Sequence, residues 1–198
     1  MATAAKEQKY RERQRQVIDA AAAVFAAKGY HGASTKEIAE RLGIRQGSLY
    51  YYFSSKEEAL AEVCRLGVEG HVQRLEGIVA EDLPAREKIR RFFLCHLEPL
   101  RTLPNHLEVF LGQRQHLGGQ RRRDVQRIAR AYEELVEGIF RAGVAGGEFA
   151  ADLDCRLAAL GLLGMCNWVP TWYARNRGHT LEQIAEQFAA IFLEGLKA

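Results

Sequence analysis

Long apolar runs are absent from this 198-residue sequence. No stretch reaches the roughly 18 consecutive apolar residues that a membrane-spanning helix needs. The opening residues, MATAAKEQKYRERQRQ, hold no apolar segment ahead of a cleavage site, so we expect no signal peptide. These two absences predict a cytoplasmic protein that has no membrane partner.

Cysteine is scarce, and its spacing matches no disulfide framework. The four cysteines are Cys64, Cys95, Cys155 and Cys166, which lie 31, 60 and 11 residues apart with no CxxC pair. Such spacing is typical of free, mostly buried thiols in a reducing compartment. A thiol-based redox sensor stays open as an alternative.

Catalytic motifs are absent as well. All four serines fall within residues 34–55, so the rest of the chain offers no serine nucleophile. The sequence contains no GxSxG, HExxH or phosphate-loop motif. His96, His106 and His116 are ten residues apart, which is not a metal-ligand spacing, and we interpret them as surface or core residues. We therefore expect neither an enzyme nor a metal or cofactor site.

Proline occurs at only four positions, and none lies in the first 83 residues. We find no convincing strand-like alternation, whereas apolar residues recur with a period of 3.6 between Gly and Pro breaks. The pattern predicts an all-α protein, with Gly29 at the C-terminal cap of the first helix. Nine helices are expected at about residues 9–28, 35–42, 46–53, 56–79, 85–102, 104–115, 120–143, 152–174 and 180–196.

The net charge of +3 is unevenly distributed along the chain. Residues 1–56 hold ten Lys or Arg and five Asp or Glu. Residues 57–198 hold 18 Lys or Arg and 20 Asp or Glu. A basic N-terminal quarter on a near-neutral protein favours an anionic partner for that end. Charge alone fits a solvated basic arm equally well.

The most informative pattern is STKEIAERLGIRQGSLYYYF, which begins at Ser34. Ser34 with Glu37 three residues later forms a capping box, which begins a helix. Gly43 ends this helix at a position that needs a left-handed backbone. A second short helix follows, with Leu49 and Phe53 on its inner face. Two short helices joined by a tight glycine turn, after a longer helix, are the layout of a helix-turn-helix.

The outer face of the second helix predicts contacts with DNA, because the N-terminal residues of this helix meet base edges in the major groove. Gln46 suits adenine, Arg45 suits guanine or a phosphate, and Ser48 can serve several bases. Gly47 lets the backbone come close to a partner. At least one of the tyrosines at 50–52 must face outward, since consecutive helical residues point about 100° apart. The competing interpretation is an ordinary helical hairpin in a bundle core.

The block TKEIAERLGIRQGSLYYYFSSKEEAL, with the preceding IDAAAAVFAAKGYHGAS, closely resembles the DNA-binding domain of the TetR family of bacterial transcriptional regulators. The resemblance covers about residues 13–62. It implies a phosphate contact for Thr35, base reading by Gln46, Ser48 and Tyr51, and DNA-backbone contacts from Tyr50, Tyr52 and Lys56. The sequence departs from the family at Arg45, where serine often caps the recognition helix, and at Tyr52, where histidine is common.

The full predicted DNA-binding set therefore has two parts. The residues of the helix-turn-helix are Thr35, Arg45, Gln46, Gly47, Ser48, Tyr50, Tyr51, Tyr52 and Lys56. A basic arm around Lys9, Arg11, Arg13 and Arg15 resembles the family's N-terminal extension, which adds phosphate or minor-groove contacts. Phosphate contacts fix the register of a protein on DNA, and base contacts fix the sequence.

The resemblance implies a DNA-binding domain over residues 1–55 and an effector-binding and dimerisation domain over residues 56–198, whose last two helices pair across a dimer axis. The predicted effector-binding residues are Phe93, Leu97, Leu107, Phe110, Leu111, Arg114, Asn167 and Trp168. The apolar side chains of this set would line a channel for an acyl chain. Arg114 and the arginines at 121–123 would meet phosphates, although a solvated charged turn explains that run as well.

The stretch GMCNW at residues 164–168, with Trp172 and Tyr173, resembles a TetR branch that responds to acyl-CoA thioesters. We therefore expect a homodimeric repressor that binds a palindromic double-stranded DNA operator and is released by a small amphipathic effector such as an acyl-CoA. Two alternatives stay open. One is a constitutive helix-turn-helix DNA-binding protein without a ligand. The other is a TetR-type regulator of an efflux or other catabolic system with a different hydrophobic effector.

Overall fold

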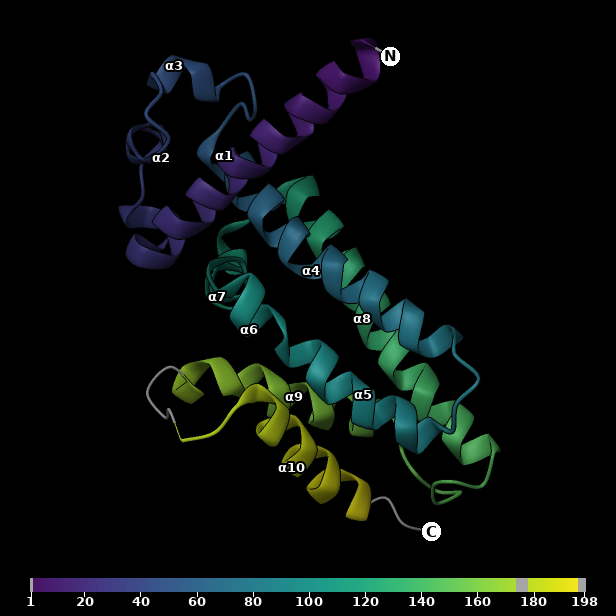
Figure 1. Ribbon diagram of the computed structural model, residues 1–198. Coiled ribbons are helices and arrows are strands. Elements are labelled where there is room, and N and C mark those ends of the chain that lie inside the picture. The colour runs from purple at the N-terminus through teal and green to yellow at the C-terminus, as the bar shows by residue number, and fades with distance from the viewer. Residues whose placement is uncertain (1, 174–177, 196–198) are drawn as a thin grey trace. The chain divides into compact units, whose positions relative to one another are not determined.

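A computed structural model describes residues 2–173 and 178–195 of the chain. These residues form helices joined by short loops, with no β-strand among them, which confirms the all-α prediction (Figure 1). None of the described helices has the length and apolar character needed to cross a membrane. The helices are α1 (Ala2–Gly32), α2 (Thr35–Arg41), α3 (Gln46–Leu49), α4 (Lys56–Ala80), α5 (Ala85–Leu97), α6 (Pro99–Thr102), α7 (Pro104–Gln113), the 3₁₀ helix η1 (Arg114–His116), α8 (Gly119–Ala145), α9 (Cys155–Tyr173) and α10 (Leu181–Glu194).

Each of the nine predicted helices has a counterpart in the structure. The one expected over residues 85–102 is divided, because Glu98 caps α5 and Pro99, which has no N–H to donate, begins the single turn of α6. The helix expected over residues 46–53 is shorter than predicted. The chain after Leu49 closes as a turn, in which the Tyr52 N–H donates to the Leu49 carbonyl at 2.8 Å.

The first helix is longer than predicted and begins at Ala2. Its early residues are mostly Ala, Glu, Gln, Lys and Arg, which are strong helix formers. Side-chain pairs one turn apart support it, since Gln8 donates to Glu12 at 3.2 Å and Arg13 donates to Gln16 at 2.7 Å. The helical backbone is interrupted at Gly29, where φ is 68°, in agreement with the predicted cap position.

The chain forms two compact units whose boundaries fall within α4, between α6 and α7, and within α8. The N-terminal unit contains Met1–Val68 and Leu103–Gln126, and the second unit, called the effector unit below, contains Glu69–Thr102 and Arg127–Ala198. Each unit has its own apolar core. Fully buried members of the N-terminal core include Val17, Ala21, Phe25, Ile38, Leu49 and Leu60, and those of the effector unit include Ile89, Phe92, Phe93, Phe140 and Leu162.

Candidate nucleic-acid interface and effector unit

The capping box predicted at the start of α2 is present. The Ser34 hydroxyl accepts from the Glu37 N–H at 3.2 Å, and the Glu37 carboxylate accepts from the Ser34 N–H at 2.9 Å. The Lys28 ammonium on α1 also donates to Glu37. Hydrogen bonds from Lys28 and then from Ser34 lower the pKa of Glu37 to about 2. These contacts hold the start of α2 against the end of α1.

The turn between α2 and α3 depends on Gly43, whose φ of 65° is the left-handed conformation that the sequence predicted. After this residue, the Ile44 N–H donates back to the Ala39 carbonyl at 3.1 Å. Leu49 and Phe53 are both buried in the core of the N-terminal unit, as predicted. The inner side of α3 is therefore packed in the core, and the opposite side faces solvent.

The polar end of α3 is exposed. Arg45, Gln46, Gly47 and Ser48 are all exposed, and the Arg45 side chain makes no capping hydrogen bond. Gln46 Nε2 donates to the Thr35 hydroxyl at 2.8 Å. This bond joins the predicted base reader on α3 to the predicted phosphate contact on α2, so the structure brings these two residues together.

The three consecutive tyrosines that follow α3 differ in their exposure to solvent. Tyr51 is 74% exposed and Tyr50 is 52% exposed, whereas Tyr52 is half-buried. Tyr10 of α1 stacks on Tyr52 with ring centroids 5.9 Å apart and meets the edge of Tyr51 at 5.8 Å. Sequence reasoning missed Tyr10, because its contact requires α1 to extend far beyond the apolar stripe. The helix-forming composition of residues 6–16 was the available signal.

The basic arm forms the first half of α1, beside this tyrosine cluster. Lys9, Arg11 and Arg15 are exposed, and Arg13 is half-buried. Tyr10 lies among these cations and contacts the segment that follows α3. The arm is thus held as a helix against the helix-turn-helix.

Lys56 has a second role beyond the one predicted for it. Its ammonium donates to the Tyr30 carbonyl at 2.9 Å and to the Ala33 carbonyl at 3.0 Å, and it lies 4.6 Å from the centre of the Tyr30 ring. The side chain therefore ties the start of α4 to the end of α1. A DNA phosphate contact from Lys56 remains a prediction.

The structure divides the predicted effector residues between the two units. Phe93 and Leu97 are buried in the core of the effector unit, and Asn167 and Trp168 are exposed on α9 of the same unit. The other four belong to the N-terminal unit, namely Leu107, Phe110, Leu111 and Arg114. Among these, the Arg114 guanidinium lies 4.6 Å from the centre of the Phe110 ring.

Two of the three arginines at 121–123 have partners within the N-terminal unit. Arg121 lies 3.9 Å from a carboxylate oxygen of Glu58, and Arg123 donates to Gln120 at 2.8 and 3.0 Å. These contacts lie in the first turns of α8, which begins at Gly119. Their predicted contact with phosphates is not tested by the structure.

A buried polar cluster lies within the core of the effector unit. The His96 ring is hydrogen-bonded through Nδ1 to the Tyr132 hydroxyl at 2.9 Å, and its Nε2 lies 3.3 Å from Asn167 Oδ1. The ring centroids of His71 and His96 are 5.2 Å apart, and the two ring planes are tilted by 52°. The Nδ1 atom of His71 has no hydrogen-bond partner among the described residues. Burial lowers the pKa of His71 to about 3 and that of His96 to about 4. Both rings are therefore neutral at pH 7.

The cysteines are free, as predicted. Cys64 and Cys166 are buried, and burial raises the pKa of Cys64 to about 12 and that of Cys166 still further. Because the thiolate is the reactive form, these two side chains are poor candidates for redox chemistry.

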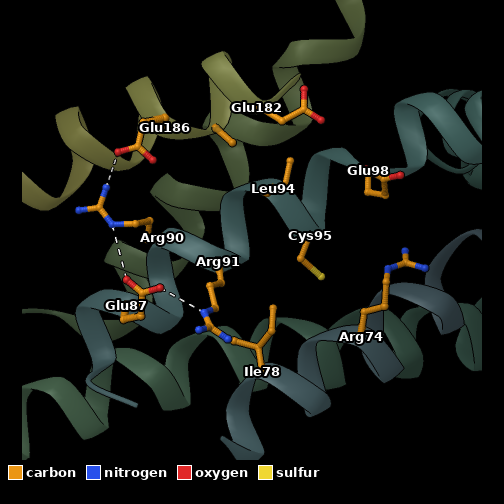
Figure 2. A pocket seen from close by; sticks show the side chains of 11 residues that line it. Arg74, Ile78, Glu87, Arg90, Arg91, Leu94, Cys95, Glu98, Glu182 and Glu186 are labelled. Carbon is orange, nitrogen blue, oxygen red and sulfur yellow. Dashed lines mark hydrogen bonds and ion pairs between the residues drawn. The ribbon is translucent and has the colours of Figure 1, made fainter. Parts of the chain in front are cut away.

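A surface groove of about 550 Å³ lies among α4, α5 and α10 of the effector unit (Figure 2). Its apolar lining comes from Ile78, Leu94, Cys95 and Ala185. Charged side chains surround this lining, among them Arg74 of α4, which Figure 2 shows on the same side as Cys95 and Glu98. No sequence pattern marks the groove, because its lining combines α4 and α5 with α10, which is distant from them in the chain.

The fold and the exposed recognition helix define a helix-turn-helix DNA-binding protein. Residues 17–63 match the family model described as bacterial regulatory proteins of the tetR family, and residues 82–196 match the tetracyclin repressor-like C-terminal domain. The chain therefore belongs to the TetR family of bacterial transcriptional regulators, as its sequence predicted.

Relatives and solved structures match nearly the whole chain. The HTH-type transcriptional repressor KstR2 of Rhodococcus jostii is 29% identical over 93% of this chain and 91% of that protein. The TetR family regulator PfmR from Thermus thermophilus superposes with a TM-score of 0.84 at 29% identity, covering 92% of this chain and 99% of that one. FadR from Bacillus subtilis, solved in complex with stearoyl-CoA, superposes with a TM-score of 0.79 at 27% identity, covering 92% of this chain and 98% of that one. The likeness thus extends through the effector unit.

Proposed function

We propose that this protein is a cytoplasmic transcriptional repressor that binds a palindromic operator as a homodimer and leaves it when an acyl-CoA binds. The observation that carries the proposal is the recognition helix of a TetR chain, anchored by buried Leu49 and Phe53, with its polar end exposed. Membership of the family and the repressor relatives support the regulatory role. Residues 1–55 would supply the DNA contacts, and residues 56–198 the effector and dimer contacts.

In this proposal, α3 reads bases and the surrounding residues hold phosphates. The exposed side chains of Arg45, Gln46 and Ser48 and the exposed backbone at Gly47 would enter the major groove. The hydroxyls of Thr35 and the tyrosines at 50–52, with Lys56 and the basic arm, would contact the DNA backbone. Because Thr35 already bonds Gln46, binding to a phosphate and to a base would be coupled.

We expect Gln46→Ala and Ser48→Ala to relax sequence preference. A lost bidentate base contact costs roughly 1–3 kcal/mol at one position, whereas a lost phosphate contact weakens all sequences alike and lowers the salt slope by about 1. Lys56→Ala should weaken binding to all sequences alike and lower the salt slope. It should also lower the stability of the protein, because it removes two hydrogen bonds to backbone carbonyls. Fluorescence polarisation on operator and random duplexes at several salt concentrations measures both effects. An unchanged ratio of operator to random binding in Gln46→Ala would contradict the assignment of α3.

The dimer contact is proposed for the exposed sides of α9 and α10. Large apolar side chains are exposed there, with Trp168 at 66%, Leu157 at 65% and Ile191 at 57% exposure. On α9, Gly161 and Gly164 lie on the same helical face as Leu157 and Trp168, and a Cβ at either glycine would meet nothing within 4 Å. An apolar helical face with small residues permits close approach of a partner helix. This surface fits pairing with its own copy across a two-fold axis.

Trp168→Glu is expected to convert the dimer into a monomer at micromolar concentration, because it places a charge in the centre of an apolar interface. Sedimentation velocity measures the change. Gln73→Glu, which adds the same charge on the exposed side of α4, is the control and should remain dimeric. A Trp168→Glu protein that is still dimeric would remove this surface from the proposal.

An acyl-CoA is the proposed effector because a regulator 27% identical to this chain was solved with stearoyl-CoA. Phe93 and Leu97, with Leu107, Phe110 and Leu111, are the proposed acyl contacts, and Arg114 is proposed for the CoA phosphates. Asn167 and Trp168 are exposed on α9, and Trp168 also belongs to the proposed dimer surface, so an effector that contacts these two residues would bind beside that surface.

The proposed mechanism is a shift between conformations. The effector would bind more tightly to a form whose two recognition helices do not match the spacing of successive major grooves, about 34–36 Å. α4 begins at Lys56 and belongs to both compact units, which makes it the proposed connection.

Calorimetry with acyl-CoAs of several chain lengths, with free CoA as the control, tests the effector. Binding of none of them would favour the constitutive regulator or a regulator with a different hydrophobic effector.

A further inference from the structure

Tyr10 of α1 contacts two residues of the proposed DNA surface. Its ring stacks on Tyr52 with the two planes 20° apart, and it meets the edge of the Tyr51 ring. Tyr51 and Tyr52 also contact each other edge to face, with ring centroids 5.4 Å apart, so the three rings form a closed cluster. Because Tyr10 is distant in the sequence from the other two, the cluster holds the first part of α1 on the segment that follows α3.

Three cations of α1 lie on one helical face beside Tyr10. Lys6, Lys9 and Arg13 are called the cation stripe below, because positions i, i+3 and i+7 share a face of a helix. Tyr10 borders this face, since it is four residues from Lys6 and three from Arg13. Lys6 and Lys9 are exposed, and Arg13 donates to Gln16 at 2.7 Å. Among the described residues, no carboxylate oxygen lies within 4.0 Å of the three cations, so their charge is available to an anionic partner.

The helical conformation of this segment limits what its cations can reach. α1 begins at Ala2, so about two helical turns, or roughly 12 Å, precede Tyr10. An α-helix with its side chains is about 10–12 Å wide, whereas the minor groove of B-DNA is about 6 Å wide. The segment is therefore too wide to enter the minor groove, but it can lie along the sugar–phosphate backbone.

We propose that Tyr10 is a positioning residue for DNA binding, which holds α1 on Tyr51 and Tyr52 so that the cation stripe contacts backbone phosphates and stays out of the minor groove. The inference rests on the proposed function, in which α3 and the tyrosines face DNA. Contacts with phosphates carry no sequence information. The stripe therefore adds affinity for any duplex and leaves the choice of sequence to α3.

Fluorescence polarisation on the full-length protein, at several salt concentrations, tests the proposal with a selected operator duplex and a random duplex. The triple variant, with Lys6→Gln, Lys9→Gln and Arg13→Gln, should weaken binding to both duplexes alike. It should lower the slope of log affinity against log salt by about 2–3 for each arm that contacts DNA, because each phosphate contact contributes about 0.9.

Variants of Tyr10 test the positioning role while all three cations remain. Tyr10→Ala should weaken binding to both duplexes about tenfold, the loss expected for two aromatic contacts that hold the arm, and it should lower the salt slope as well. Tyr10→Phe, which keeps the ring, should recover wild-type binding and the wild-type slope. A Tyr10→Ala protein with the salt slope of the wild type would overturn the proposal.

Combining Tyr10→Ala with the triple variant separates positioning from a general effect on the fold. Because Tyr10 acts through the cation stripe in this proposal, adding Tyr10→Ala to the triple variant should change the affinity less than twofold. A further tenfold loss would overturn the proposal, since Tyr10 would then act through the fold or the other tyrosines. Arg141→Gln, which removes an exposed cation of the effector unit, is the control for Lys9→Gln. It should keep the wild-type slope, whereas Lys9→Gln should lower the slope by about 1 for each arm.

The flanking sequence of the operator tests the exclusion from the minor groove. Duplexes flanked by A·T or by G·C pairs should bind equally within about twofold, because base edges in the minor groove distinguish these pairs and phosphate contacts do not. A preference for A·T flanks that the triple variant loses would overturn the proposal. A wild type without preference for the operator would contradict the proposed function and this inference with it. A wild type that prefers the operator, with an unchanged salt slope in Tyr10→Ala, would contradict this inference alone.

Discussion

Gly143→Ala is expected to lower the free energy of unfolding of the effector unit by about 3 kcal/mol, the upper end of the usual range for an overpacked core. A Cβ at this position would lie 2.2 and 2.3 Å from two ring atoms of Phe149 and 2.9 Å from the Ala85 Cβ. Phe149 is itself buried against Phe140, so its ring has little room to move.

Chemical denaturation of Gly143→Ala, with Gly138→Ala as the control, measures this effect. Gly138 lies on the same helix, is exposed, and has nothing within 4 Å of an added Cβ. The control should gain roughly 0.5–1 kcal/mol, because alanine is the better helix former. If both variants are as stable as the wild type, the described packing of α8 on Phe149 is wrong.

Lowering the pH is expected to reduce the free energy of unfolding already at pH values well above those at which carboxylates take up protons. Burial lowers the pKa of His71 to about 3 and that of His96 to about 4, from an ordinary value of 6.5. The neighbouring charge of Arg74 acts in the same direction on both rings. The unfolded chain therefore takes up protons below pH 6.5 that the folded chain does not, and stability falls as the pH drops from 6.5 toward 4.

The expected size of this effect at pH 5 is about 2 kcal/mol for each of the two histidines. His106, whose pKa is also lowered by burial, acts in the same direction. His71→Gln should remove about 2 kcal/mol of the stability difference between pH 7 and pH 5. His179→Gln, at an exposed position, should leave that difference unchanged. A His71→Gln protein whose stability falls with pH in parallel with the wild type would refute this assignment.

The features that the sequence predicted are those set by local chemistry. The capping box of Ser34 and Glu37, the left-handed Gly43, and the burial of Leu49 and Phe53 all depend on residues within one or two helical turns. Short-range hydrogen bonds and sterics decide them, so a single sequence is sufficient. The resemblance to the family added the partners of this surface as expectations.

The features that the sequence did not predict depend on long-range contacts. Apolar periodicity shows which face of a helix is buried, but it does not show which helix covers that face. The predicted effector set includes residues of both compact units, such as Phe93 and Phe110, and it stays a prediction. The Glu148 carboxylate accepts from the Ala85 and Arg86 N–H groups at 2.7 and 3.0 Å and caps α5 from the segment that follows α8. No local pattern marks such a cap.

The proposed control of a DNA-binding repressor by an acyl-CoA is tested most directly by one measurement. The purified protein selects its own sites from a pool of random duplexes, and the recovered DNA is then titrated with the protein in the presence of stearoyl-CoA or free CoA. We predict a near-palindromic site whose half-sites are one helical turn apart, with loss of binding on addition of stearoyl-CoA alone. Recovery of no preferred sequence, or binding that stearoyl-CoA leaves unchanged, would contradict the account.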